Sequence, residues 1–181
     1  MEILIIALPL LASIISGFFG KFIGDRNSEI VTSFLVTISA VLSIMVFYEV
    51  IFNQYQENIR IATWISSGSL NVNWSMKIDS LSAVMLVVVT SVSSLVHVYS
   101  IGYMSHDPHK PRFMAYLSLF TFAMLMLVTS DNFIQLFFGW EGVGLCSYFL
   151  IGFWFKKDTA NSAAIKAFLV NRVGDFGFAL G

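Results

Sequence analysis

Long hydrophobic runs separated by short polar stretches dominate the chain and determine its predicted elements. A helix needs ~20 consecutive apolar residues to cross a bilayer. Segments of this character, of which the fourth is short, lie at residues 3–23, 30–52, 81–103, 113–129, 133–155 and 159–181. Asp79 and Ser80 immediately precede the third segment, as a helix cap would. The pattern predicts an all-α polytopic membrane protein with about six transmembrane helices.

A different pattern occupies the long polar connection between the second and third segments. There, Val72, Trp74, Met76 and Ile78 alternate with Asn71, Asn73, Ser75 and Lys77. A period of two is typical of a half-buried strand; residues 61–65 supply a preceding strand, and residues 66–69 can form the turn. We therefore expect a small extramembrane β-hairpin at about residues 60–78, which covers helix ends or touches a neighbouring subunit.

The domain organisation is simple. No Pro-rich or Ser-rich stretch separates blocks of different composition, so residues 1–181 are expected to form a single membrane domain. The start, Met1-Glu2-Ile3, lacks the positive region of a cleavable signal, so the first helix is expected to be retained. The sixth segment still runs at Gly181, which favours a fragment of a longer protein over a natural terminus.

Composition agrees with a membrane location and excludes several functions. Apolar residues make up 57% of the chain and charged residues 12%, against about 25% charged in soluble domains. The net charge of −1 provides no basic field for nucleic acid. A single cysteine, Cys146, allows no intrachain disulfide and no multi-cysteine metal or iron–sulfur site, and we expect it to be a small packing residue.

Loop charges predict the orientation of the helices in the membrane. If the helices alternate in direction, one side receives Lys21, Arg26, Lys110, Arg112, Lys156 and Lys157. The other side receives Arg60 and Lys77. Because cytoplasmic loops carry an excess of Lys and Arg, the N-terminus is expected outside, with the loops near the first set in the cytoplasm or matrix.

Glu141 is the first candidate functional residue, because it is a carboxylate inside the fifth hydrophobic segment. At a rise of 1.5 Å per residue it lies ~14 Å from a helix start near Asn132. Placing an ionisable group at that depth costs ~2.5–3.5 kcal/mol. Glu141 could be a packing residue hydrogen-bonded to a neighbouring helix, but an uncharged Gln would do this at lower cost. We therefore favour proton handling.

Further ionisable residues lie in the sixth and third segments. Arg172 and Asp175 are three residues apart, so they share a helix face and can pair, either to lock helices together or to move protons. Lys166 is a possible relay or an interfacial anchor. His97 could relay protons, although a hydrogen-bonded core histidine is the favoured interpretation.

Glycines accompany the candidate site and the first helix. Gly139, Gly142 and Gly144 surround Glu141 and allow either close helix approach or water access. The first helix carries Gly17, Gly20 and Gly24, which we interpret as packing residues.

Five ordered blocks carry a family resemblance. They are Asp79–Leu81, Leu95–Met104, Arg112–Leu117, Gly139–Leu145 and Asn171–Asp175. From Trp64 to Ala179 the chain resembles the N-terminal part of the L subunit family, the antiporter-like membrane subunit of proton-pumping NADH:quinone oxidoreductase (respiratory complex I). The first two helices match only loosely.

The resemblance implies more than the residues do by themselves. It implies a larger antiporter-like helix bundle with inverted repeats and broken helices. Glu141 would match the family's key glutamate, which pairs with a lysine on the seventh helix, beyond Gly181. Arg172 and Asp175 would match charged residues implicated in coupling. This chain would hold one side of a proton switch, in which a nearby cation favours ionised Glu141 and its withdrawal favours protonation.

The resemblance also implies partners and a location. NADH, FMN, iron–sulfur clusters and quinone are expected in partner subunits, with no cofactor or metal in this chain, since it has no CxxC and no Gly-rich dinucleotide loop. The partners are the lipid bilayer and other membrane subunits of complex I, especially a neighbouring antiporter-like subunit. We expect the bacterial inner (plasma) membrane, because no targeting segment precedes the first helix. The mitochondrial inner membrane is the alternative.

Three functions remain open. The favoured one is a proton-translocating membrane subunit of NADH:quinone oxidoreductase, a translocase without redox chemistry of its own. The large subunit of a multi-subunit sodium/proton antiporter would share the same charged residues. A structural membrane scaffold would use no ion path.

Overall fold

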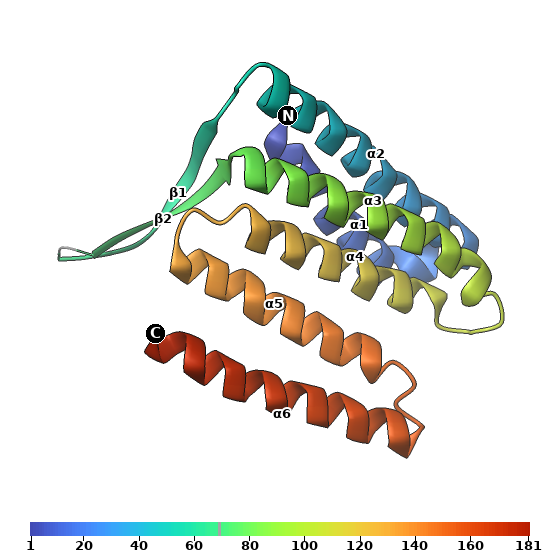
Figure 1. The fold of residues 1–181 in the computed structure, drawn as a ribbon. Helices are drawn as coiled ribbons and strands as arrows, with labels where there is room; N and C mark the ends of the chain where they lie inside the picture. Colours follow the sequence, from blue (N-terminus) through green and yellow to red (C-terminus); the bar gives the residue numbers. More distant parts are fainter. Residues whose placement is uncertain (69) are drawn as a thin grey trace.

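A computed structural model describes residues 1–68 and 70–181, and within these residues it contains six helices and one β-hairpin (Figure 1). The elements are α1 (Glu2–Ile23), α2 (Asp25–Phe52), β1 (Glu57–Ser67), β2 (Leu70–Ile78), α3 (Ser80–Tyr103), α4 (Lys110–Val128), α5 (Phe133–Ile151) and α6 (Asp158–Leu180). The predicted fold class, a polytopic helix bundle with a small hairpin, is confirmed.

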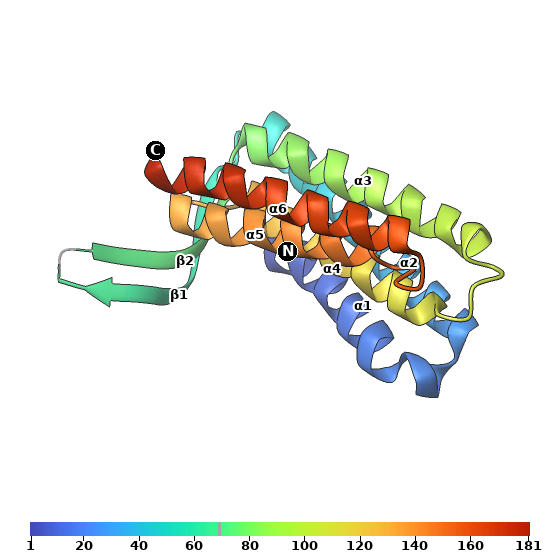
Figure 2. The same cartoon turned by 90° about the horizontal axis from the view of Figure 1, so that it is seen from below.

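The helices pack side by side and alternate in direction. α1 contacts α2 and α4, α2 contacts α3, and α5 lies against α4 (Figures 1 and 2). α6 packs on α5 at the outer edge of the bundle. The core joins Ile5, Val46, Leu86 and Leu125 to Met76 of β2. Among the described residues, α6 contacts mainly α5.

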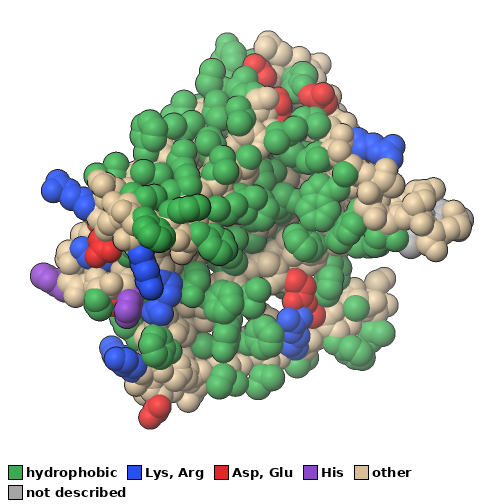
Figure 3. Space-filling view, turned by 180° about the vertical axis from the view of Figure 1, so that it is seen from behind, with side chains coloured by type: hydrophobic (Ala, Val, Ile, Leu, Met, Phe, Trp, Pro, Cys, Tyr) green, Lys and Arg blue, Asp and Glu red, His purple; other side chains and the backbone are tan. Residues whose placement is uncertain are grey.

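Five helices, α1 to α5, are long and apolar enough to cross a membrane. α6 has 23 residues, which is also long enough, but Lys166, Arg172 and Asp175 lower its hydropathy. The face shown in Figure 3 has a broad hydrophobic surface, and its Lys, Arg and His side chains gather mainly at one end. A belt of exposed apolar side chains suits contact with lipid.

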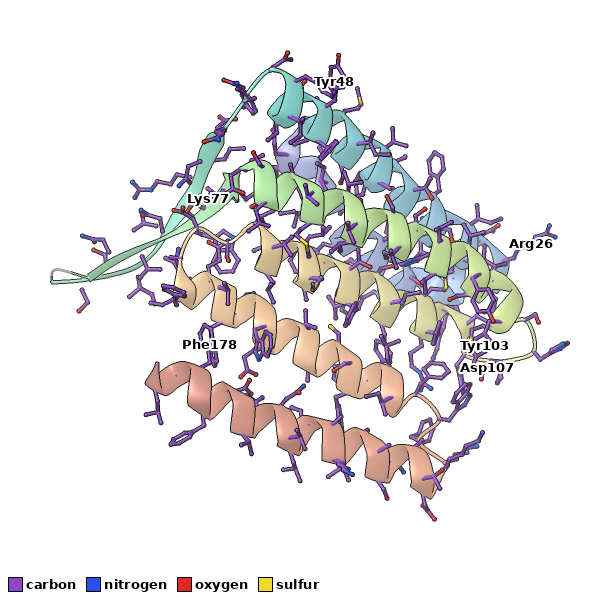
Figure 4. All side chains as sticks on the ribbon, in the orientation of Figure 1. Arg26, Tyr48, Lys77, Tyr103, Asp107 and Phe178 are labelled. Carbon is purple, nitrogen blue, oxygen red and sulfur yellow. The ribbon has the colours of Figure 1, made fainter. Side chains whose placement is uncertain are left out.

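The alternating helices place the connections at two ends of the bundle. Figure 4 shows Arg26 and Asp107 at one end and Tyr48 and Lys77 at the other. The short connections α1–α2, α3–α4 and α5–α6 share the first end, which is the arrangement that the loop-charge argument assumed.

Two helix limits differ from the predicted ones by four or more residues. α2 begins at Asp25 rather than near residue 30, because its first turn is polar and hydropathy detects only the apolar part of the helix. α5 ends at Ile151 rather than Phe155. The next aromatic residue, Phe153, leaves the helix and packs edge-on against Phe113 of α4.

The packing prediction for the glycines of α1 holds at Gly20 and fails at Gly24. A Cβ atom at Gly20 would lie 2.6 Å from the Cβ of Pro111, so α1 and α4 approach closely there. A Cβ atom at Gly24 would meet nothing within 4 Å. The φ of Gly24 is 88°, however, and residues with a side chain disfavour a positive φ. Gly24 is therefore required by the turn between α1 and α2.

The hairpin begins earlier than predicted, at Glu57, and β2 docks on the start of α5. The backbone N–H of Ser75 donates to Oε1 of Gln135, and Nδ2 of Asn132 donates to the carbonyl oxygen of Asn73. These bonds bury Ser75, which the alternating pattern had placed on the polar face. Of the predicted turn at residues 66–69, Ser69 lies outside the described residues.

Asp79 caps α3 as predicted, and its removal should be measurable. Its Oδ1 accepts the backbone N–H of Ser82 at 2.8 Å. Asp79→Ala should destabilise the protein by about 1 kcal/mol. Hydrogen bonds from Ser82, with the nearby Lys77 ammonium, hold the pKa of Asp79 below its usual range. Its charge-dependent stabilisation is therefore present above the unfolded-state pKa and is lost as pH falls through the lower folded-state pKa.

The matched control is Asp79→Asn, which keeps an acceptor oxygen but cannot ionise. Thermal unfolding of the full-length protein in detergent should show the wild type losing stability relative to this variant as the medium is acidified. Parallel pH profiles for the two proteins would contradict the assignment.

Candidate functional site

α5 and α6 form an antiparallel pair joined by the short connection at residues 152–157. Ring contacts fix their register near both ends of the interface. The ring centroids of Tyr148 and Phe168 lie 5.5 Å apart, and those of Phe137 and Phe178 lie 5.5 Å apart; Figure 4 labels Phe178. This register brings the middle of α5 opposite the second half of α6.

Glu141, Arg172 and Asp175 meet in that interface. Nη1 of Arg172 donates to both carboxylate oxygens of Glu141 and lies 3.3 Å from Oδ2 of Asp175. The Asp175 side chain is 10% exposed, Glu141 is 25% exposed and Arg172 is 48% exposed. One cation therefore serves two carboxylates, of which Asp175 is the more deeply buried.

Two aromatic residues hold these charges in place. Nε1 of Trp140 donates to Oδ1 of Asp175 at 2.9 Å, so both Asp175 oxygens are engaged. The Arg172 guanidinium lies 4.7 Å from the centre of the Phe168 ring. A cavity of about 10 Å³ lies between the two helices beside Glu141 and Asn171. A space of that size is comparable to that of one water molecule.

The glycines around Glu141 have different neighbours. A Cβ atom at Gly139 would lie 2.7 Å from Cα of Leu127, and one at Gly142 would lie 3.1 Å from Cβ of Ala123. Both glycines therefore allow α5 to approach α4 closely. At Gly144 a Cβ atom would lie 3.4 Å from Nδ2 of Asn171 on α6. The close-approach interpretation accounts for Gly139 and Gly142.

Lys166 and His97 lie outside this cluster. Lys166 is exposed on α6, and no hydrogen bond or ion pair is found for its side chain in the described parts of the chain. His97 is fully buried between α3 and α4. Its Nδ1 lies 2.8 Å from the carbonyl oxygen of Ser93, which only accepts, so Nδ1 carries the proton and Nε2 accepts from Ser118 at 3.0 Å. His97 has the contacts of a hydrogen-bonded core histidine.

Two features of the cluster were not predicted from the sequence: the contact of Arg172 with Glu141 and the hydrogen bond from Trp140 to Asp175. The short α5–α6 connection was a usable signal, because it requires the two helices to be antiparallel neighbours. Counting back from the connection would have placed Glu141 and Arg172 at similar depths.

The chemistry available to the cluster is proton and charge transfer. Carboxylates bind and release protons, whereas a guanidinium stays charged. Two carboxylates beside one guanidinium give the cluster a formal net charge of −1 when both carboxylates are ionised. Among residues 1–68 and 70–181, no group of three His, Cys, Asp or Glu side chains could hold a metal ion.

The helices are apolar and antiparallel, and one pair of them carries a charged cluster in its middle. These features define a polytopic membrane protein with an ionisable site at membrane depth. The family described as "NADH-Ubiquinone oxidoreductase (complex I), chain 5 N-terminus" matches residues 64–114. The family described as "NADH:quinone oxidoreductase/Mrp antiporter, TM" matches residues 130–181. The chain belongs to the family of antiporter-like membrane subunits of complex I.

Individual relatives agree with this family. NADH-ubiquinone oxidoreductase chain 5 of Arabidopsis thaliana is 61% identical over 100% of this chain and 27% of its own length. NADH-quinone oxidoreductase subunit L of Rhodobacter capsulatus is 54% identical over 100% of this chain and 26% of its own length. The chain thus spans about a quarter of the length of these relatives. Its apolar helices, together with membership of this respiratory family, support a multi-pass inner-membrane location for this chain.

A solved structure supports the fold. A chain of the membrane-bound sulfane sulfur reductase, an archaeal respiratory membrane complex, superposes with a TM-score of 0.84. The match covers 99% of this chain and 35% of that chain at 18% identity. At this identity the likeness concerns the arrangement of the helices.

Proposed function

We propose that this chain supplies an acidic proton-transfer site to the membrane part of a proton-pumping NADH:quinone oxidoreductase. The observation that carries the proposal is the contact of Arg172 with both Glu141 and Asp175 between α5 and α6. NADH, FMN, iron–sulfur clusters and quinone are bound by partner subunits in this proposal. The direct neighbours are other membrane subunits, including a second antiporter-like subunit, and residues 1–181 act as one membrane domain.

The proposed mechanism is electrostatic. With Arg172 against Glu141, the ionised carboxylate is compensated and holds no proton. When Arg172 moves toward Asp175, Glu141 loses its cation and takes a proton from one side of the membrane. The return of Arg172 expels the proton. Arg172 already lies 3.3 Å from Oδ2 of Asp175, and the bond from Trp140 keeps that carboxylate in place as the second position.

Glu141→Gln tests this mechanism, because Gln keeps the shape of Glu141 but cannot ionise. The full-length protein should assemble in its complex, and NADH-driven proton uptake into membrane vesicles should fall by ~10²-fold, the usual contribution of a positioned proton-transfer group. NADH:quinone turnover should fall with it. The matched control is Glu57→Gln, which removes an exposed carboxylate at the start of β1 and should leave both rates unchanged.

The same experiment separates the other two functions. The second matching family includes antiporters in its description, which keeps sodium/proton exchange as a second candidate. Intact NADH oxidation with lost sodium/proton exchange would establish the antiporter function. Unchanged rates in an assembled complex would mean that the cluster is structural.

A further inference from the structure

Two cavities meet at the positively charged end of the bundle. The first, here the headgroup cavity, has a volume of about 290 Å³ and is lined by Arg112, Lys156, Lys157, His109, Asp107 and Trp154. It lies where the α3–α4 and α5–α6 connections come together, at the end that Figure 4 marks with Asp107. Three cationic side chains line this cavity, Arg112 from the first turn of α4 and Lys156 and Lys157 from the α5–α6 connection.

Arg112 lines both cavities and has one N–H donor that no described residue engages. Its Nη2 donates to the carbonyl oxygen of Phe153 at 3.1 Å, and its guanidinium lies 4.6 Å from the Phe153 ring centre. Its Nε is buried and has no hydrogen-bond partner among the described residues. Guanidinium donors suit phosphate oxygens, because their fork geometry matches them.

The single acidic residue of the headgroup cavity is already engaged. Oδ2 of Asp107 accepts from Nε1 of Trp154 at 2.9 Å, and Oδ1 accepts from the backbone N–H of His109 at 2.8 Å. Burial raises the pKa of Asp107, but these hydrogen bonds outweigh it and hold the pKa below its usual range. Asp107 therefore shapes the cavity while the excess positive charge remains.

The second cavity, here the acyl groove, continues from the first toward the membrane interior. It has a volume of about 380 Å³ and shares Arg112, Phe153 and Phe155 with the headgroup cavity. It extends to Tyr116 and Tyr148, each about one helical turn further into α4 and α5. A charged cavity thus opens directly into a groove lined by aromatic side chains.

We propose that the headgroup cavity and the acyl groove together bind one anionic phospholipid. The phosphate lies among Arg112, Lys156 and Lys157, and an acyl chain lies along Tyr116, Tyr148 and Ile165. Basic pockets between membrane helices at the cytoplasmic or matrix side are suited to anionic headgroups. The Lys157 ammonium lies over the Trp154 ring, 5.1 Å from its centre, and Trp is a residue type that favours the headgroup level of a membrane.

A photo-crosslinking experiment tests this site on the full-length protein in its complex. Benzoylphenylalanine replaces Phe155, which lines both cavities, and the complex is reconstituted in phosphatidylcholine vesicles with or without phosphatidylglycerol. After illumination, mass spectrometry of the peptide that contains position 155 should show phosphatidylglycerol adducts in preference to phosphatidylcholine adducts. The double change Lys156→Gln/Lys157→Gln should raise the phosphatidylglycerol fraction needed for half-maximal labelling by about fivefold for each charge removed.

Arg26→Gln is the matched control, because it removes a cation at the same end that lines neither cavity. It should leave the labelling unchanged. Equal labelling by the two lipids, or labelling insensitive to the lysine changes, would overturn the proposal. Suppression of the lipid labelling by inorganic phosphate that is present during illumination, but not by chloride at equal ionic strength, would also overturn it and assign the headgroup cavity to a free phosphate ion.

Discussion

Replacing Arg172 by Gln should destabilise the protein by about 2 kcal/mol. Breaking a fully buried ion pair costs about 3–5 kcal/mol, and an exposed pair contributes about 0–1 kcal/mol. The contacts of Arg172 fall between these limits, because its own side chain is 48% exposed while Asp175 is 10% exposed. The loss should appear in the midpoint of thermal unfolding of the purified full-length protein and in the amount of assembled complex on a native gel.

Two further variants show whether charge compensation is the cause. Arg172→Gln/Asp175→Asn removes the more buried carboxylate together with the cation, so it should recover much of the lost stability. Lys166→Gln removes another α6 cation, which lies on the exposed surface, and should change stability by less than about 0.5 kcal/mol. If the double variant is as unstable as Arg172→Gln, the role of Arg172 is packing against Phe168.

The helix pattern could be predicted because hydropathy and helix length both follow from the bilayer. The apolar runs place α1, α3 and α5 within a few residues of their observed starts, and the period-two alternation locates β2. The polar start of α2 was missed because hydropathy does not distinguish a polar helical turn from a loop. Asp25 opens α2 directly after the left-handed turn at Gly24, and only the backbone geometry shows this.

The residues of the site could be predicted from the sequence, but the contacts between them could not. Glu141, Arg172 and Asp175 could each be selected because a charge at membrane depth is costly without a partner. Which carboxylate meets the arginine depends on the register of α5 against α6, and side-chain contacts such as Tyr148 with Phe168 set that register. Tertiary packing brings both carboxylates to one guanidinium, and the sequence of a single helix does not contain that information.

A second large effect is expected from a substitution at Gly139, where α4 and α5 approach closely. A Cβ atom there would lie 2.7 Å from Cα and 2.8 Å from the backbone nitrogen of Leu127. Because backbone atoms cannot rotate away as a side chain would, Gly139→Ala must push the two helices apart. Overpacking of this kind costs about 1–3 kcal/mol, although the better helix propensity of Ala returns about 0.5–1 kcal/mol.

Gly139→Ala should therefore lower both the thermal midpoint and the yield of assembled complex, and it should slow proton uptake, because Glu141 lies two residues further along α5. Gly174→Ala is the matched control on α6, where a Cβ atom meets nothing within 4 Å and helix propensity alone should apply. The control is expected to be neutral or slightly stabilising, so the two substitutions should differ in sign. A stable Gly139→Ala protein with slowed proton uptake would instead mean that the bundle absorbs the added methyl group by moving α5, and with it Glu141, relative to Arg172.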